Sequence, residues 1–183
     1  MLLNLELWVR PLLAVAIAFA ISFAAVPVVK TFATKVGAID IPDGKRRVHD
    51  HPIPRMGGLA IFLGFLLSVV LFADITRQVR GILIGAVLIV ACGAIDDVVN
   101  LRAWIKLLVQ VAAAVIAVAH GVVIEFFSNP NIFSDNELLV LGWLSIPVTV
   151  LWIVGITNSV NLIDGLDGLA VGVSTIASVT MFV

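Results

Sequence analysis

The sequence predicts an all-α polytopic membrane protein. Of its 183 residues, 61% are hydrophobic and only 13% are charged, and the mean hydropathy is +1.18. Soluble domains have a charged fraction of about 25%. Long apolar runs alternate with short polar segments, so we expect a single transmembrane domain over residues 1–183. It should contain about five complete transmembrane helices and the start of a sixth.

The first apolar run extends from Pro11 to Val29 and holds no charged residue in its 19 positions. A helix of this length crosses about 30 Å of hydrocarbon at about 1.5 Å per residue. Lys30 and Lys35 follow the run, whereas a secretion signal has its basic residues first. We therefore interpret the run as a transmembrane helix.

A basic segment from Lys30 to Arg55 follows this helix. It contains six of the eleven basic residues of the chain, which favours the cytoplasmic side by the positive-inside tendency. These residues are Lys30, Lys35, Lys45, Arg46, Arg47 and Arg55. Lys45 and Arg46 could bind phosphates or anionic lipid headgroups, or the segment could serve only to set the topology.

Four further apolar runs are expected as transmembrane helices at residues 59–73, 81–95, 104–124 and 138–157. Pro147 should kink the last of them. Residues 126–137 are rich in Asn, Ser, Asp and Pro, which indicates an outer loop that could contain a short hairpin. Residues 169–183 form a last apolar run that is too short to span comfortably, so the chain is expected to end inside a sixth helix.

Counting these spans places three polar features on one side of the membrane. They are the basic segment, the Asp96–Asp97 pair and the cluster from Asn158 to Asp167. Adjacent carboxylates 4 Å apart repel by about 1–4 kcal/mol, and a divalent cation relieves the repulsion. Mg²⁺ prefers one or two carboxylates with water and substrate phosphate, so Asp96 and Asp97 suit a magnesium diphosphate. The alternative is a helix end in contact with water.

Two further features favour a binding site. Lys106 follows a turn and is expected to face the acidic pair and hold a phosphate, although a lysine at a helix start can also snorkel to the interface. The second cluster has four oxygen-bearing side chains at a three-residue period: Asn158, Asn161, Asp164 and Asp167. In a helix the first three share a face. Gly165 and Gly168 favour a broken or closely packed helix.

These residues resemble a known family, the polyprenyl-phosphate N-acetylhexosamine-1-phosphate transferases, whose branches include WecA, TagO and MraY. The resemblance covers essentially the whole chain and rests on three ordered motifs. They are Pro52-Ile-Pro-Arg-Met-Gly57-Gly58, Asp96-Asp97-Val-Val-Asn-Leu-Arg followed by Lys106 and Gln110, and Asn158-Ser-Val-Asn161-Leu-Ile-Asp164-Gly-Leu-Asp167-Gly-Leu. The segment Arg-Val-His-Asp-His-Pro-Ile-Pro is closer to the WecA and TagO branches.

The resemblance implies transfer of a sugar 1-phosphate from a UDP-sugar to undecaprenyl phosphate or another polyprenyl phosphate, with release of UMP. N-acetylglucosamine 1-phosphate is the expected sugar phosphate, and the step begins cell-wall or surface polysaccharide synthesis. It implies Mg²⁺ as cofactor, with Mn²⁺ as an alternative. The expected partners are a UDP-N-acetylhexosamine, a polyprenyl phosphate and the bilayer of a bacterial plasma membrane, with the active face cytoplasmic. No nucleic acid is expected, and a homodimer is left open.

The residue patterns and the resemblance together suggest roles for individual residues; those of Lys45, Arg46 and Asn158 rest on the patterns alone. The candidate catalytic residues are Asp96, Asp97, Asp164 and Asp167. The candidate substrate-binding residues are Lys106, Asn158, Asn161, Lys45 and Arg46. The candidate metal ligands are Asp97 and Asn161. Family members continue for several more helices with a Met-Gly-Asp motif and a His-rich loop, so these 183 residues alone are expected to be inactive.

Four other functions stay open at this point. One is the phospho-N-acetylmuramoyl-pentapeptide transferase of peptidoglycan synthesis. A membrane prenyltransferase would need aspartates four residues apart, whereas Asp97 is followed by Asn100 and Lys106. A cation transporter would place acidic residues near the bilayer midplane, whereas these lie at the ends of apolar runs. A structural membrane scaffold is the last.

Overall fold

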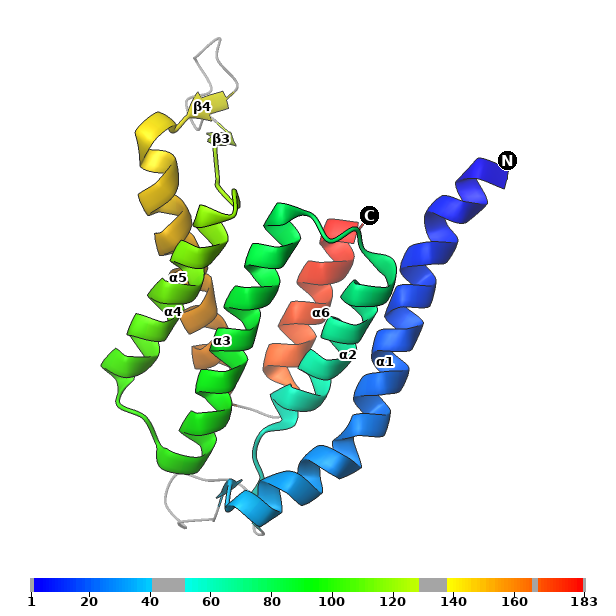
Figure 1. Cartoon of the computed structure of the whole chain (residues 1–183), viewed down its shortest axis with the longest axis vertical. Helices are drawn as coiled ribbons and strands as arrows, with labels where there is room; N and C mark the ends of the chain where they lie inside the picture. The colour runs from blue at the N-terminus through cyan, green and yellow to red at the C-terminus, as the bar shows by residue number, and fades with distance from the viewer. Residues whose placement is uncertain (1, 41–51, 129–137, 166–167, 183) are drawn as a thin grey trace.

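The protein is a bundle of helices that run side by side. The computed structural model describes residues 2–40, 52–128, 138–165 and 168–182, and only the backbone of residues 2–8. Over these ranges the helices are α1 Leu2–Val36, α2 Gly57–Phe72, α3 Arg77–Val99, α4 Ala103–Ala119, α5 Ser145–Ile163 and α6 Leu169–Phe182 (Figure 1). Helix α1 packs on α2, α3 on α4, and α4 on α5, and successive helices alternate in direction.

Three of the described helical segments are long and apolar enough to cross a membrane. They are Val9–Val36 in α1, Arg77–Val99, and Gly142–Ile163, which joins the short 3-10 helix η1 (Gly142–Leu144) to α5. Helices α2 and α4 are apolar and have 16 and 17 residues, a length of about 24–26 Å at 1.5 Å per residue. The predicted all-α polytopic membrane fold is therefore confirmed.

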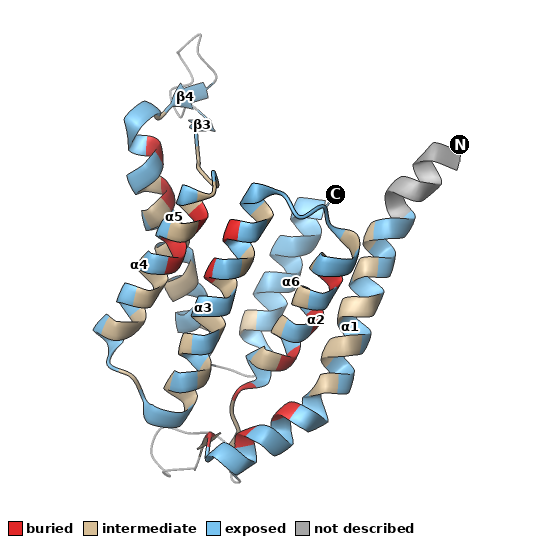
Figure 2. Cartoon of the chain, viewed as in Figure 1, coloured by how far each residue is buried: buried red, intermediate tan, exposed pale blue. Residues whose placement is uncertain are grey.

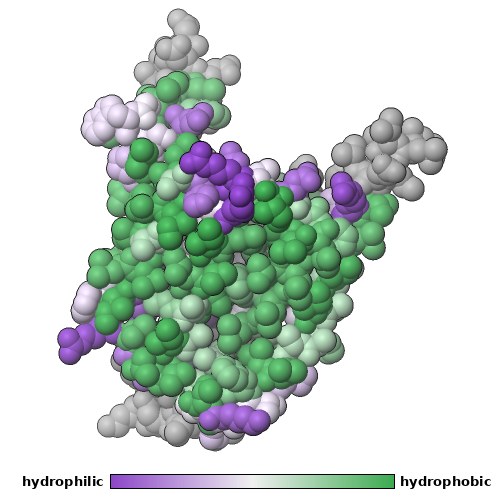
Figure 3. Space-filling model, viewed as in Figure 1, coloured by the Kyte–Doolittle hydropathy of each residue, from purple (hydrophilic) through white to green (hydrophobic). Residues whose placement is uncertain are grey.

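The outer surface of the bundle is mostly apolar. Few side chains are buried within the described chain (Figure 2), and Phe19, Phe23 and Leu151 are each at least 70% exposed. Figure 3 shows a largely hydrophobic belt across one face, with hydrophilic residues gathered towards its two ends. In water this exposure would be unfavourable, but lipid tails are as apolar as these side chains.

Small residues allow the helices to approach closely. A Cβ atom on Gly64 of α2 would lie 2.4 Å from the Ala18 carbonyl oxygen of α1 and closer still to the Ser22 hydroxyl. One turn further on, Ser68 donates a hydrogen bond to the Ala14 carbonyl at 2.7 Å. Contacts of this kind replace the hydrophobic effect as the source of helix association in lipid.

Helices α3 and α4 pack in the same way. A Cβ on Gly81 would lie 2.4 Å from the Cβ of His120, and one on Gly85 would lie 3.1 Å from the Ala113 carbonyl oxygen. Ala113 and Ala117 of α4 are buried in this part of the bundle. These contacts hold the N-terminal part of α3 against the C-terminal part of α4.

Several helix boundaries differ from those predicted. Helix α1 extends beyond 11–29 at both ends, and it bends in its C-terminal half, where Pro27 lacks the N–H of an ordinary helix residue (Figure 1). Helix α3 continues past Ile95 and includes both Asp96 and Asp97. Helix α4 ends at Ala119 instead of 124, because Gly121 turns the chain with a φ of 93°.

The fifth helix also begins later than predicted. Residues 138–140 form a strand, β4 (Leu138–Val140), instead of the start of this helix. It pairs antiparallel with β3 (Phe126–Ser128), so one of the two paired strands lies beyond residues 126–137, where the short hairpin is predicted. Helix α5 starts at Ser145, whose hydroxyl donates to the Ile124 carbonyl, and Thr149 accepts from the Ile124 N–H. Pro147 therefore lies in the first turn, where its missing N–H costs no helix hydrogen bond and the predicted kink does not apply.

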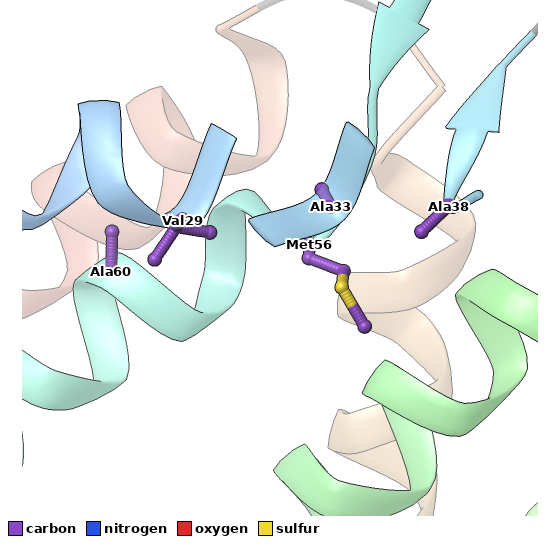
Figure 4. Close-up of a cluster of buried hydrophobic side chains, with 5 residues drawn as sticks. All are labelled: Val29, Ala33, Ala38, Met56 and Ala60. Atoms are coloured by element: carbon purple, nitrogen blue, oxygen red, sulfur yellow. The ribbon is translucent and has the colours of Figure 1, made fainter. Parts of the chain in front are cut away.

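A second ribbon joins the ends of α1 and α2. Strand β1 (Ile39–Asp40) pairs antiparallel with β2 (Ile53–Pro54). Met56 then precedes α2 in the left-handed conformation, with a φ of 70°. Its side chain is buried in a small apolar cluster of Val29, Ala33, Ala38, Met56 and Ala60 (Figure 4). This cluster holds the start of α2 against the end of α1.

Candidate functional site

The first part of the site is the tight turn from α3 to α4. Asn100 ends α3 in the left-handed conformation with a φ of 51°, and its N–H donates to the Asp96 carbonyl at 2.9 Å. Asparagine tolerates this conformation better than most residues. Only Asn100, Leu101 and Arg102 separate the two helices, so the first turn of α4 lies beside the last turn of α3.

Asp96 organises this turn with its side chain. Its Oδ1 accepts a hydrogen bond from the Leu101 N–H at 2.7 Å, and its Oδ2 accepts one from Lys106 Nζ at 2.9 Å. The two side chains are 27% and 36% exposed. Lys106 therefore faces the acidic pair as predicted, and it is held in place by an ion pair with Asp96.

Asp97 points elsewhere. Its Oδ2 accepts a hydrogen bond from the Met56 N–H at 3.1 Å. Neighbouring residues of a helix do not face the same way, so the two carboxylates diverge. Asp96 interacts with α4, and Asp97 interacts with the start of α2. Asp96 and Asp97 are therefore not equivalent in this structure, because they contact different helices.

A pair of amide side chains joins α4 to α5. Asn158 Nδ2 donates to Gln110 Oε1 at 2.6 Å and also to the Val154 carbonyl at 2.8 Å, while Gln110 Nε2 lies 3.5 Å from Asn158 Oδ1. Gln110 is four residues after Lys106, so both lie on one face of α4. Asn158, a predicted substrate-binding residue, is thus already engaged in contacts within the bundle.

These residues line one cavity of about 270 Å³ between α3, α4 and α5. Asp96, Lys106, Asn158 and Asn161 all contribute to its wall. The others are Ile89, Cys92, Gly93, Ala103, Val109, Gln110 and Thr157. The wall of the cavity combines a carboxylate, an ammonium and three amide side chains with apolar residues. The cavity is thus suited to a small polar ligand such as a phosphate group.

Two other predicted site residues, Asp97 and Asp164, are not among the described residues that line this cavity. Helix α5 ends at Ile163, and Asp164 is its exposed C-cap, so the helical face predicted for the second cluster does not continue past it. The predicted break is confirmed, because Gly168 has a φ of 79° before α6 begins. Lys45, Arg46 and Asp167 lie outside the described residues. Their roles, like the other residue assignments, stay predictions.

The donor atoms of the cavity fit a hard divalent cation in part. Asp96 and Asn161 present a carboxylate and a carboxamide oxygen, and Mg²⁺ commonly takes one or two protein oxygens and completes its shell with water and phosphate. Within the described ranges, no group of three or more His, Cys, Asp or Glu side chains could hold a metal ion. A cation here would need substrate oxygens to complete its coordination.

Two contributors to the site were not assigned a role from the sequence. One is the backbone N–H of Met56, which meets Asp97, and no sequence signal marks a backbone group. The other is the side chain of Gln110, which holds Asn158. A signal existed for Gln110, because it is the polar residue one turn after Lys106 in an apolar helix.

The sequence that forms this site matches a known family. A family model described as glycosyl transferase family 4 matches residues 79–183, which include α3 from its third residue and the whole of α4, α5 and α6. The chain belongs to glycosyl transferase family 4. The match contains every described residue that lines the cavity between α3, α4 and α5.

Relatives of this family 4 chain come from several bacteria. A probable undecaprenyl-phosphate N-acetylglucosaminyl 1-phosphate transferase of Bacillus subtilis (strain 168) is 45% identical over 174 residues, covering 92% of this chain and 48% of the relative. A decaprenyl-phosphate N-acetylglucosaminephosphotransferase of Mycobacterium tuberculosis (strain ATCC 25618 / H37Rv) is 34% identical over 170 residues, covering 88% and 42%. A phospho-N-acetylmuramoyl-pentapeptide-transferase of Listeria monocytogenes serotype 4b (strain F2365) is 31% identical over 177 residues, covering 88% and 55%. The chain spans about half the length of these curated relatives.

Proposed function

We propose that the complete protein transfers N-acetylglucosamine 1-phosphate from UDP-N-acetylglucosamine to a polyprenyl phosphate. The observation that carries the proposal is the cavity in which the Asp96–Lys106 ion pair and Asn161 meet at the ends of three apolar helices. The 45% identity to the Bacillus subtilis protein, named a probable undecaprenyl-phosphate N-acetylglucosaminyl 1-phosphate transferase, supports the choice of sugar and lipid. The membrane location suits a substrate whose isoprenoid chain stays in lipid.

The proposed reaction is a phosphoryl transfer. An oxygen of the polyprenyl phosphate attacks the β-phosphorus of the UDP-sugar, and the bond from that phosphorus to the bridging oxygen breaks. UMP leaves with the bridging oxygen, and the sugar stays on a polyprenyl diphosphate. Phosphoryl transfer asks for positioning and charge neutralisation more than for covalent chemistry.

The side chains of the cavity match these two needs. A lysine ammonium has three donors, and Asp96 takes one of those of Lys106, which leaves two for phosphate oxygens. The ion pair also holds the ammonium in a fixed position before a substrate arrives. The Gln110–Asn158 pair fixes α4 against α5 and so sets the separation of Lys106 from Asn161.

A divalent cation is part of the proposal. Asp97 and Asn161, the metal ligands implied by the family resemblance, would hold Mg²⁺ with help from Asp96, and the ion would neutralise charge on the diphosphate. Asp97 reaches such an ion only if its contact with the Met56 N–H is exchanged or shared. A carboxylate oxygen has two lone pairs, so sharing is chemically available.

The cytoplasmic side is the proposed location of the active face. The C-terminal ends of α1 and α3 and the N-terminal ends of α2 and α4 lie at the same end of the bundle (Figure 1). Lys30, Lys35 and Arg55 are near this end, and positive residues favour the cytoplasm. A bacterial plasma membrane with UDP-sugars on its inner side would supply both substrates there.

The second candidate is transfer of phospho-N-acetylmuramoyl-pentapeptide. The 31% identity to the Listeria monocytogenes protein supports this candidate. It ranks second because the identity to the Bacillus subtilis protein is higher, at 45%. The membrane prenyltransferase, the cation transporter and the scaffold lose support with membership of glycosyl transferase family 4.

The test is an assay of the complete protein in membranes. Radiolabelled UDP-N-acetylglucosamine, polyprenyl phosphate and Mg²⁺ should give a labelled lipid and an equal amount of UMP, and chelation of Mg²⁺ should stop both. A labelled lipid from UDP-N-acetylmuramoyl-pentapeptide alone would favour the second candidate, and no UMP from either nucleotide would refute the proposal. Since the chain is about half as long as its relatives, we expect no UMP release from these 183 residues alone.

A further inference from the structure

We infer that a second cavity, between α1, β2 and the start of α2, binds the phosphate headgroup of a membrane lipid. Its volume is about 260 Å³. It shares no lining residue with the cavity of Asp96 and Lys106, so the two are separate sites. Lys30 and Arg55 supply its positive charge, and Val26, Val29, Ile53 and Ala60 supply apolar wall.

The charge of this cavity suits a phosphate. Within the described part of the chain, the Lys30 ammonium has no carboxylate partner. Arg55 donates through one terminal nitrogen to Asp40 at 2.5 Å, and its side chain remains 30% exposed. A guanidinium has five N–H donors in a fixed fork, so the ion pair with Asp40 leaves donors for a phosphate oxygen.

The apolar wall favours a lipid over a free phosphate ion. Val29 and Ala60 are buried, and Val26 is 51% exposed at the outer edge of the cavity. Apolar side chains can pack against the carbon chain next to a headgroup, but they make no favourable contact with a fully hydrated phosphate ion. Lys30 directly follows the apolar run of α1, so its ammonium lies where headgroups meet the hydrocarbon.

The position of the cavity relates it to the first site. Arg55 lines the lipid cavity, and the next residue, Met56, donates its N–H to Asp97. A phosphate would thus be bound by Arg55, the residue directly before the one whose N–H contacts Asp97. Two lipids carry a phosphate headgroup of this kind: an anionic phospholipid and a polyprenyl phosphate. The choice of a polyprenyl phosphate rests on the proposed function.

The test measures bound lipid on the full chain. The protein is placed in phosphatidylcholine nanodiscs that contain either phosphatidylglycerol or polyprenyl phosphate, and native mass spectrometry counts the anionic lipids retained after gentle release. Lys30→Ala should lower retention about fivefold, as expected for one basic contact. Val26→Trp, which fills the cavity from an exposed position without changing charge, should lower it similarly.

Lys35→Ala is the matched control, because Lys35 is on the same helix but lines a different cavity. It should retain lipid like the parent protein. Retention from the phosphatidylglycerol discs identifies a phospholipid site, and retention only from the other discs identifies the polyprenyl phosphate. Equal retention by the parent, Lys30→Ala and Val26→Trp proteins would overturn the inference. The number of retained lipids is measured without catalysis. A failure of the proposed function would therefore not change this result.

Discussion

The backbone N–H of Met56 donates a hydrogen bond to Oδ2 of Asp97 at 3.1 Å, across 41 positions of the chain. Met56 is the N-cap residue of α2 and Asp97 lies in the last turn of α3, so the bond joins two motifs that are far apart in the sequence. Met56 has a left-handed backbone, and its side chain is buried. Asp97 therefore has a structural contact as well as its proposed role in the reaction.

Substitutions of Asp97 should separate these two roles. Asp97→Asn keeps an oxygen acceptor for the Met56 N–H but loses the charge, so stability should change little while UMP release by the complete protein falls about 100-fold. Asp97→Ala also removes the acceptor, so it should lower the free energy of unfolding by about 1 kcal/mol more than Asp97→Asn does. Thermal unfolding in detergent and the UMP assay measure the two effects. Full turnover by Asp97→Asn would show that the charge has no part in the reaction.

Loss of the Lys106 ammonium should affect activity far more than stability. Its ion pair with Asp96 is about a third exposed, and such pairs contribute about 0–1 kcal/mol. A donor aimed at developing phosphate charge contributes much more, so Lys106→Ala should lower kcat of the complete protein by about 100- to 1000-fold. Lys35→Ala removes the same charge outside the cavity and should stay active. Equal activity of both variants would contradict a phosphate contact for Lys106.

The amide pair between α4 and α5 should show measurable coupling. Gln110 and Asn158 exchange hydrogen bonds, and interhelical bonds in membranes average about 0.6 kcal/mol with maxima of about 1.7 kcal/mol. A double-mutant cycle with Gln110→Leu and Asn158→Leu should give coupling in this range, measured by unfolding in mixed micelles. Ser159→Ala is the control, because the Ser159 hydroxyl donates to the Gly155 carbonyl of its own helix and so joins no two helices. Additive effects of the two leucines would mean that the pair does not stabilise the helix contact.

The existence of the helices could be predicted because hydropathy is a local property of the chain. Their ends could not, because distant groups decide them. Helix α4 stops at Ala119, and the next residues extend so that Ile124 meets Ser145 and Thr149 on α5. The apolar residues 138–140 satisfy a helical pattern equally well, yet they pair with β3. Neither partner is visible in the apolar run itself.

The sequence also predicted part of the site: which side chains come close together, but not which groups they contact. Spacing placed Lys106 near Asp96, and the structure pairs them directly. Spacing also suggested one helical face for Asn158, Asn161 and Asp164, but α5 ends before Asp164. The divergence of Asp96 and Asp97 follows from helix geometry. Their partners do not, since Leu101 N–H and Met56 N–H are backbone groups that any sequence would carry.

Close packing of α1 on α2 gives a prediction about stability alone. A Cβ on Gly64 would overlap the Ala18 carbonyl at 2.4 Å, so Gly64→Ala should destabilise the protein by about 1–3 kcal/mol through overpacking. Gly155 of α5 has nothing within 4 Å of such a Cβ, and Gly155→Ala should be neutral or stabilising by up to about 1 kcal/mol from helix propensity. Unfolding in detergent compares the two. If both variants changed the free energy of unfolding equally, α1 and α2 would not be in close contact at Gly64.

The lone cysteine of the sequence provides a reporter for the first cavity. Cys92 is the only cysteine of the chain, and it lines this cavity in a partly exposed state. In the complete protein with any other cysteines replaced by serine, UDP-N-acetylglucosamine with Mg²⁺ should slow alkylation of Cys92 by N-ethylmaleimide in proportion to the bound fraction. The rate is followed by mass spectrometry at rising nucleotide concentration. Phosphatidylglycerol should give no protection, because the second cavity does not include Cys92. If a nucleotide concentration that saturates UMP release leaves the alkylation rate unchanged, the nucleotide binds elsewhere and the cavity between α3, α4 and α5 is not the substrate site.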